Sequence, residues 1–292
     1  MKKTIHGLAL LLVLAVPLGL SGQEEERVKE SFSFKAGTDR PLEVVLDIDA
    51  GTVEVEKGTD AVSGQVDVDY LREDNHVKVK FDEKTNRLQV KVDRDNWTKM
   101  RHDGDNNDHC DDWLKIHVTL PFGVDQYFDA RIKAGEVNMN VGGLRFREFL
   151  LTTWAGEVTV RFAEPNGIVM DDLDINTKIG ESDLIQLGNA RFRQAVIDGG
   201  IGEMRLDFSG QLEEGSRAKV DLDIGETTVV IPESAGVRMR IGGGLGFLSQ
   251  KEIDNAFIQR GRYYYSDNYD EKKKGFFLLI TPGLGELKVE TE

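Results

Sequence analysis

The chain has 292 residues, and its 52 acidic against 37 basic side chains give a formal net charge of −15. Such a chain repels nucleic acid and anionic lipid, and it favours cations or basic partners. Cys110 is the only cysteine, so no intrachain disulfide can form and stability must come from a packed core.

Residues 1–22 have the layout of a bacterial signal peptide, with two lysines, an apolar stretch and then small residues. The stretch is short for a membrane span and is broken by Pro17 and Gly19. We expect a single extracytoplasmic domain over residues 23–292, periplasmic, surface-bound or secreted, with no stable membrane insertion. Loss of Lys2 and Lys3 leaves it a charge of −17.

Short alternating strands fill the chain up to about residue 122, where we predict an irregular N-terminal part packed on the common core. The first is LDIDAGTVEVEKG, residues 46–58, with Thr52 after its Gly. The others are VSGQVDVDYL (62–71), HVKVKF (76–81), RLQVKV (87–92) and WLKIHVTLP (113–121).

The segment RHDGDNNDHCDDW, residues 101–113, is the densest cluster of potential metal ligands. Its alternate acidic spacing is that of a calcium loop, but the Gly and the final Glu of an EF-hand are absent. Its two histidines and one cysteine lack the paired spacing of a zinc site. We favour a solvated loop without a metal, and the remaining calcium candidates are Asp103, Asp105 and Asn107.

From about residue 123 a motif built on Gly-Glu recurs. Its first five copies are 21, 24, 22 and 23 residues apart, counted Gly to Gly, which indicates a structural repeat. The copies are KAGEVNMNV (133–141), WAGEVTVRF (154–162), KIGESDLIQ (178–186), GIGEMRLDF (200–208), DIGETTVVI (223–231) and GLGELKVE (283–290).

Apolar residues alternate on both sides of each Gly-Glu, as Val137 and Met139 after it and Ala130 and Ile132 before it. Gly-Glu is therefore predicted to be a corner that shifts the inward phase by one residue, so that both arms face one core. The pattern predicts an all-β, solenoid-like stack of short strands with about 20 to 24 residues per coil. The alternative is a two-layer antiparallel stack of hairpins.

In register, the glutamates of the motif would form a column with carboxylates about 5 Å apart. Each neighbouring pair would repel by roughly 0.8 kcal/mol in water. The column could attract calcium or a polycation, but we favour a solvated corner whose repulsion Lys133 and Lys178 soften. Its members are Glu136, Glu157, Glu181, Glu203, Glu226 and Glu286.

Towards the C-terminus, residues 251–259 are interpreted as a loop or a single turn. Tyr263–Tyr265 with Tyr269, and Phe276–Ile280, could form an aromatic binding surface, but a capping strand with its loop is favoured. The chain has no G-x-S-x-G elbow, H-E-x-x-H pair or phosphate loop. We therefore predict a protein that is not an enzyme, without catalytic residues or cofactors.

The order AGTVEV, VSGQVDV, RLQVKV and IHVTLPFGV, followed by AGEV and IGE turns, resembles the bacterial putative-adhesin, or toastrack, family of secreted β-repeat domains. The segments DIGETTVVIPESAGVRMRIGGGLG, SDNY (266–269) and ITPGLGELKVE (280–290) are similar to the extracytoplasmic domain of LiaF-like envelope stress proteins. The resemblance covers about residues 30 to 290. It implies a non-catalytic interaction module of the cell envelope and supplies no catalytic residues.

The sequence thus favours an extracytoplasmic binding or scaffolding protein of the bacterial envelope, with a protein or glycan partner and no nucleic acid. The first alternative is a secreted carbohydrate-active β-solenoid enzyme. The second is an envelope-stress sensing module that acts with a membrane partner.

Overall fold

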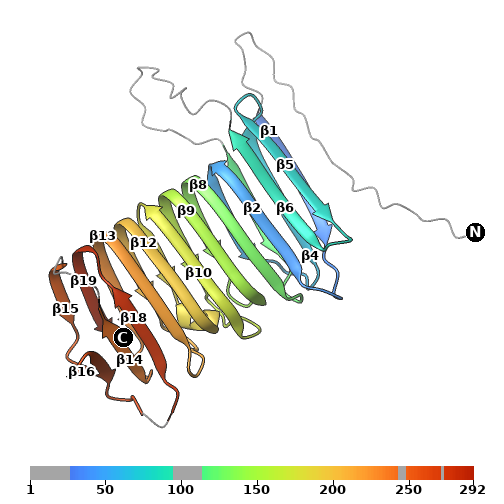
Figure 1. Cartoon of the computed structure of the whole chain (residues 1–292). Helices are drawn as coiled ribbons and strands as arrows, with labels where there is room; N and C mark the ends of the chain where they lie inside the picture. Colours follow the sequence, from blue (N-terminus) through green and yellow to red (C-terminus); the bar gives the residue numbers. More distant parts are fainter. Residues whose placement is uncertain (1–26, 95–113, 243–247, 271–272) are drawn as a thin grey trace, which may run out of the picture.

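The computed structural model describes residues 27–94, 114–242, 248–270 and 273–292, which form one elongated stack of β-coils (Figure 1). The expected signal peptide and the segment with Asp103, Asp105 and Asn107 lie outside the described residues. In the described ranges, no helix has the length and apolar character to span a membrane.

Each regular coil runs along one face of the stack, bends at Gly-Glu and continues along a second face. Neighbouring coils pair in parallel, with Gly135 opposite Gly156 and Gly202 opposite Gly225. The solenoid-like stack is confirmed, and the antiparallel hairpin alternative is wrong for these coils. Their strands are β8 (Gln126–Asn140), β9 (Phe146–Arg161), β10 (Met170–Ile179), β11 (Ser182–Ile185), β12 (Phe192–Asp207) and β13 (Arg217–Ile231).

Burial follows the predicted shift of phase at the corner. In β8 the side chains of Ile132 and Val137 are both buried although they are an odd number of positions apart, five, so the inward position moves by one across Gly135. The core between the two faces contains a cluster of phenylalanines. Phe149 stacks on Phe128 at 4.9 Å between ring centroids and meets Phe162 edge-on at 5.8 Å.

The corner glycines stand directly on one another with no room for a side chain. A Cβ on Gly202 would lie 1.9 Å from the carbonyl oxygen of Gly180, and a Cβ on Gly180 would lie 1.9 Å from that of Gly156. All seven glycines of this ladder, which are named below, have φ between 122° and 143°, a backbone conformation that residues with a Cβ avoid. In spatial order the ladder is Gly51, Gly135, Gly156, Gly180, Gly202, Gly225 and Gly285.

At the N-terminal end the order in space departs from the order in the chain. The coil of β2 (Leu42–Ala50) and β3 (Thr52–Lys57) lies directly against β8, with Ala50 opposite Ala134. The later coil of β6 (Arg87–Arg94) and β7 (Lys115–Leu120) lies on its outer side. Antiparallel strands cap this end: β5 (Asn75–Asp82) on β6, β4 (Ser63–Leu71) on β7, and β1 (Arg27–Lys35) on β4.

At the C-terminal end the last segment is inserted into the stack. β18 (Phe276–Thr281) and β19 (Leu284–Thr291) lie between β13 and the terminal coil of β14 (Val237–Ile241) and β15 (Leu248–Ile253). The hairpin of β16 (Phe257–Arg260) and β17 (Tyr263–Ser266) pairs antiparallel with β14.

The capping strand predicted at Tyr263–Tyr265 is therefore confirmed. The same prediction is wrong for Phe276–Ile280, because β18 lies between two coils. The loop or single turn expected at 251–259 is also wrong, since the segment contributes to β15 and β16. Backbone pairing with β19 and β17, and not an apolar side-chain pattern, holds these short strands.

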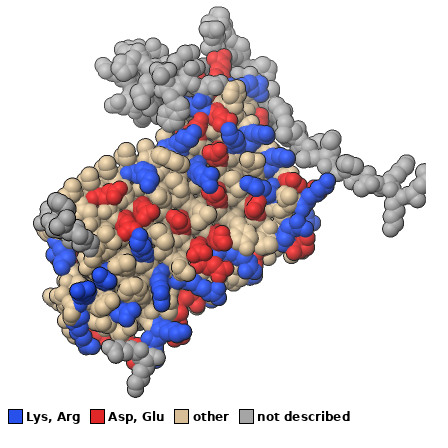
Figure 2. Space-filling view, in the orientation of Figure 1, with Lys and Arg blue, Asp and Glu red and all other residues tan. Residues whose placement is uncertain are grey.

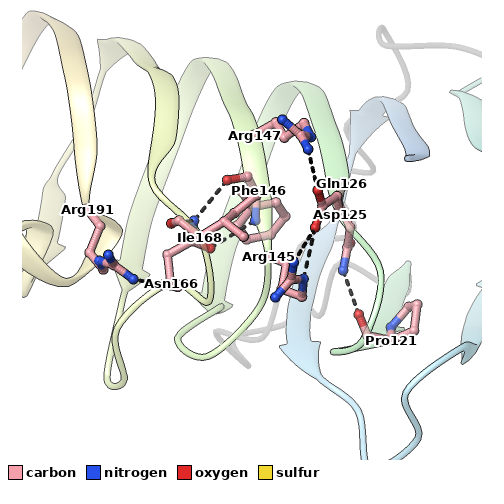
Figure 3. A network of polar contacts seen from close by, with 9 residues as sticks. All are labelled: Pro121, Asp125, Gln126, Arg145, Phe146, Arg147, Asn166, Ile168 and Arg191. Carbon is pink, nitrogen blue, oxygen red and sulfur yellow. Dashed lines mark hydrogen bonds and ion pairs between the residues drawn. The ribbon is translucent and has the colours of Figure 1, made fainter. Parts of the chain in front are cut away.

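Buried asparagines fix the turns that lead from one coil to the next. Asn166 accepts a hydrogen bond from the N–H of Phe146 at 2.9 Å and donates to the carbonyls of Phe146 and Ile168 at 2.8 and 2.9 Å (Figure 3). Asn189, in the 3-10 helix η1 (Leu187–Ala190), donates in the same way to the carbonyl of Phe162. Beside them, Asp125 accepts from Arg145 and Arg147 of the next coil (Figure 3).

Replacement of Asn166 by alanine is expected to lower the free energy of unfolding by about 3 kcal/mol, since several buried backbone groups lose their partner. Urea denaturation followed by far-UV circular dichroism measures the loss. Asn138→Ala, on the exposed side of β8, is the control and is expected to change stability by less than about 0.5 kcal/mol. Equal effects of both variants would contradict the role of Asn166.

Candidate functional site

The predicted glutamate column exists along the corner. Glu136 lies opposite Glu157, Glu203 opposite Glu226, and Glu226 opposite Glu286. Glu181 completes the column, because the adjoining Ser182 pairs with Val158 on one side and with Met204 on the other. All six side chains are exposed. Parallel strands about 4.8 Å apart therefore align six carboxylates over about 24 Å.

These glutamates lack the basic partners that other surface acids, such as Asp125 and Glu213, have within the described residues. In the part of the chain that the structure describes, none of the six makes an ion pair. Lys133, expected to soften their repulsion, instead binds Asp49 at 2.5 Å. Among the described residues, no group of three or more histidine, cysteine or acidic side chains could hold a metal ion. The column therefore has the character of a linear anionic surface.

A second row, of aliphatic side chains, runs beside the glutamates on the other side of the glycine ladder. Ile179 lies opposite Ile201, Ile201 opposite Ile224, and Ile224 opposite Leu284. Their exposed fractions are 57%, 50%, 48% and 48% in the same order. Four large aliphatic side chains half open to water over about 14 Å form a contiguous apolar strip.

A shallow recess adjoins this strip. Its lining is mostly apolar, with one acidic residue: Ile201, Leu222, Asp223, Ile224, Pro282, Gly283 and Leu284. A Cβ on Gly283 would lie 1.8 Å from the carbonyl oxygen of Asp223, so no side chain can fill the recess from that position. The corner thus offers an acidic row, an apolar row and a hollow in which an apolar group could be held.

Sequence reasoning did not identify the aliphatic row. The residue before each Gly continues the inward phase of the first arm, as Ile224 does after Val220 and Leu222, so alternation predicts that it is buried. In the structure the bend at the glycine turns this position towards solvent. The change from Ala134 and Ala155 to isoleucine or leucine in later copies is the signal that was available.

The face of the stack seen in Figure 2 differs from the corner, because acidic and basic side chains are interspersed on it. Arg193 pairs with Asp171 at 2.5 Å, and Lys219 pairs with Asp221. Asp174 has no such cation and lies between Leu150 and Val196 of the neighbouring coils. Desolvation, and then the charges of Asp198 and Asp172, raise the pKa of Asp174.

Asp174→Asn is therefore expected to stabilise the fold at pH 7. A carboxyl whose pKa is raised on folding destabilises the folded state once it ionises, as the pH rises from the unfolded pKa of about 3.9 through the folded pKa. Near pH 3 the carboxyl is protonated in both states, so the stability gained in Asp174→Asn should vanish there. Denaturant titrations at several pH values measure this. Asp254→Asn should show the opposite sign at pH 7, because hydrogen bonds from the Ala256 N–H and from Thr291 lower the pKa of Asp254. A gain for Asp174→Asn that persists at pH 3 would contradict the prediction.

A hollow at the N-terminal end gathers acids and bases from β1, β3, β4 and β7, among them Asp67 and His117. Arg27 binds Asp69 through two hydrogen bonds of 2.7 and 2.6 Å, and Lys29 adds a third contact at 3.1 Å. The hydrogen bond from Arg27 lowers the pKa of Asp69. A general acid at neutral pH requires a raised pKa, so Asp69 is not suited to that role.

The tyrosines of the C-terminal cap hold the cap together. Tyr265 packs against Tyr269 at 5.1 Å between ring centroids and lies under the guanidinium of Arg260 at 5.5 Å. Tyr263 lies under Arg238 at 5.2 Å. These contacts bind β17 to its neighbours and leave the rings only half exposed.

Parallel coils, a continuous glycine ladder and the two rows of side chains beside it define a β-solenoid that presents one of its corners to solvent. The chain belongs to the toast_rack family: the model of the N-terminal domain of toast_rack, DUF2154, matches residues 22–167, half of the chain. The resemblance to the toastrack family is thereby confirmed. The similarity to LiaF-like proteins is not shown, because this match does not reach the C-terminal part.

Two solved structures are similar to the chain at low identity. A putative cell adhesion protein from Clostridium sporogenes is 14% identical, with 91% of this chain and 100% of that chain covered and a TM-score of 0.41. A putative adhesin from Bacteroides fragilis is 12% identical, with 91% and 98% covered and a TM-score of 0.40. A search of curated proteins found no match.

Proposed function

We propose that this chain is a non-catalytic binding or scaffolding protein of the bacterial cell envelope, and that it holds its protein or glycan partner at the Gly-Glu corner. The observation that carries the proposal is the row of half-exposed aliphatic side chains beside six glutamates that make no ion pair with any other described residue. Apolar strips of this kind on soluble domains are typical of interaction sites. The envelope setting is supported by the signal-peptide pattern of residues 1–22.

The stack suits this role because its corner is rigid. The glycine ladder leaves no space between coils, and strands β8, β9, β12 and β13 continue through the bend with the same register on both sides of it. A partner therefore meets side chains whose spacing is set before binding, which reduces the entropy lost on association.

The test is a pull-down from envelope extract with the tagged, exported protein, followed by analysis of bound proteins and glycans. The variant is Ile201→Ser with Ile224→Ser, which should retain the fold because both side chains are half exposed. Tyr127→Ser, 36% exposed on β8, is the matched control away from the corner.

We expect a partner that the wild type and the Tyr127 variant recover equally and that the corner variant loses. Recovery of the same partner by all three proteins would reject the corner as the binding surface. Turnover of an envelope glycan by the wild type would favour the carbohydrate-active enzyme. Retention of the tagged protein in the cytoplasmic fraction would reject the envelope setting.

A further inference from the structure

We propose that the corner binds a basic amphipathic helix of a partner protein, lying along the axis of the stack with its apolar side chains on the aliphatic row and its lysines or arginines on the glutamate row. This rests on the proposed function and specifies the chemistry of the partner. It goes beyond the general statement that the corner binds.

The two rows are parallel and adjacent. In each coil the aliphatic residue precedes the ladder glycine and the glutamate follows it, as Ile201 and Glu203 flank Gly202. Four aliphatic residues, from Ile179 to Leu284, face the same coils as the last four glutamates, from Glu181 to Glu286. A ligand that matches both rows needs an apolar stripe beside a cationic stripe.

Most backbone groups at the corner already have partners. Each of the coils from β8 to β13 and the coil of β18 and β19 is paired on both sides, so the N–H and C=O groups of its paired residues are used within the stack. A strand laid across it would leave its own backbone without partners from this protein. A helix satisfies its backbone internally and can bind through side chains alone.

The repeat distance leads to the same choice. Coils are about 4.8 Å apart, a helix returns the same face about every 5.4 Å, and a strand only about every 6.8 Å. Across the three steps from Ile179 to Leu284 a helix drifts by about 2 Å, which side-chain rotamers can absorb. A strand falls out of step by about 2 Å at every coil.

Charge and shape complete the match. Six glutamates that have no basic partner in the described ranges, on a chain of net charge −15, attract cations and accelerate their encounter. The recess between Ile201, Ile224 and Pro282 can receive one large apolar side chain of the helix. Such a buried anchor is the usual centre of a helix-binding groove.

The experiment measures binding of synthetic 18-residue peptides by fluorescence anisotropy at physiological salt. The probe contains only leucine, lysine and alanine, with leucines at helical spacing and lysines beside them. A second peptide of identical composition alternates leucine and lysine in the pattern of a strand. A third has the helical pattern with glutamate in place of lysine, and polylysine of equal charge is the purely electrostatic competitor.

We expect the basic helical peptide to bind at least about tenfold more tightly than the alternating and acidic peptides. Ile201→Ser with Ile224→Ser should weaken it by about tenfold or more, and Glu203→Gln with Glu226→Gln by several-fold, with a weaker dependence on salt. Glu73→Gln with Glu83→Gln removes two exposed charges from turns outside the corner and should change the affinity by less than about twofold.

Equal binding of the helical and alternating peptides, or unchanged affinity in the isoleucine variant, would overturn the proposal. Equal losses of affinity in the corner variant Glu203→Gln with Glu226→Gln and in the control variant Glu73→Gln with Glu83→Gln would show non-specific attraction to an acidic protein. That result would also overturn the proposal. A partner captured from extract through the corner, together with failure of the helical peptide to bind, would reject the helix and leave the proposed function standing.

Discussion

Replacing Gly202 with valine is expected to lower the free energy of unfolding by about 4 kcal/mol, through backbone strain and overpacking together. Gly202 has φ 139°, and its Cβ would lie 1.9 Å from the carbonyl oxygen of Gly180. The backbone angle alone accounts for a cost of about 1 kcal/mol or more. The steric clash with the neighbouring coil accounts for the larger part of the expected loss of stability. Urea denaturation of the purified variant measures the loss.

Gly261→Val provides the matched control. Gly261, in the turn between β16 and β17, also has a positive φ, 63°, but no atom lies within 4 Å of its Cβ position. Only strain of about 1 to 2 kcal/mol is expected there. If the two variants lose equal stability, the close approach of the corner glycines does not determine the cost.

Phe149→Ala is expected to lower the free energy of unfolding by about 3 to 5 kcal/mol, because a fully buried ring leaves a cavity. Phe149 contacts Phe128, Phe146 and Phe162, so its removal disturbs three ring contacts in the middle of the core. Denaturant titration gives the magnitude, and loss of near-UV circular dichroism reports the packing of the remaining rings.

The control for this variant is Tyr127→Ala on the same face of the stack, where the ring is 36% exposed. It is expected to cost less than about 1 kcal/mol. A similar loss in both variants would mean that the phenylalanine cluster does not dominate the core.

Much of the candidate site was predictable and part of it was not. The glutamate column follows from a constant motif, since identical repeats in register must align identical positions. The aliphatic row does not, because alternation assigns Ile201 and Ile224 to the core and only the bend exposes them. The partners in salt bridges could not be predicted from the sequence either. Lys133 is near Glu136 in the sequence, but it binds Asp49 of the neighbouring coil.

The sequence by itself determined the β-coils, their Gly-Glu corners and the inward-facing residues away from the bend, because alternation and the glycine requirement are local properties of the chain. Only the tertiary structure decided which coils are neighbours. β18 and β19 enter between β13 and β14–β15, and β2–β3 lies between β6–β7 and β8. Backbone ladders are the same for every coil, so no local pattern specifies the partner. The neighbours are selected by the packing of whole inner faces, as where buried Val220 lies opposite buried Ile280. The resulting order of coils also places Ile224 beside Leu284 in the aliphatic row.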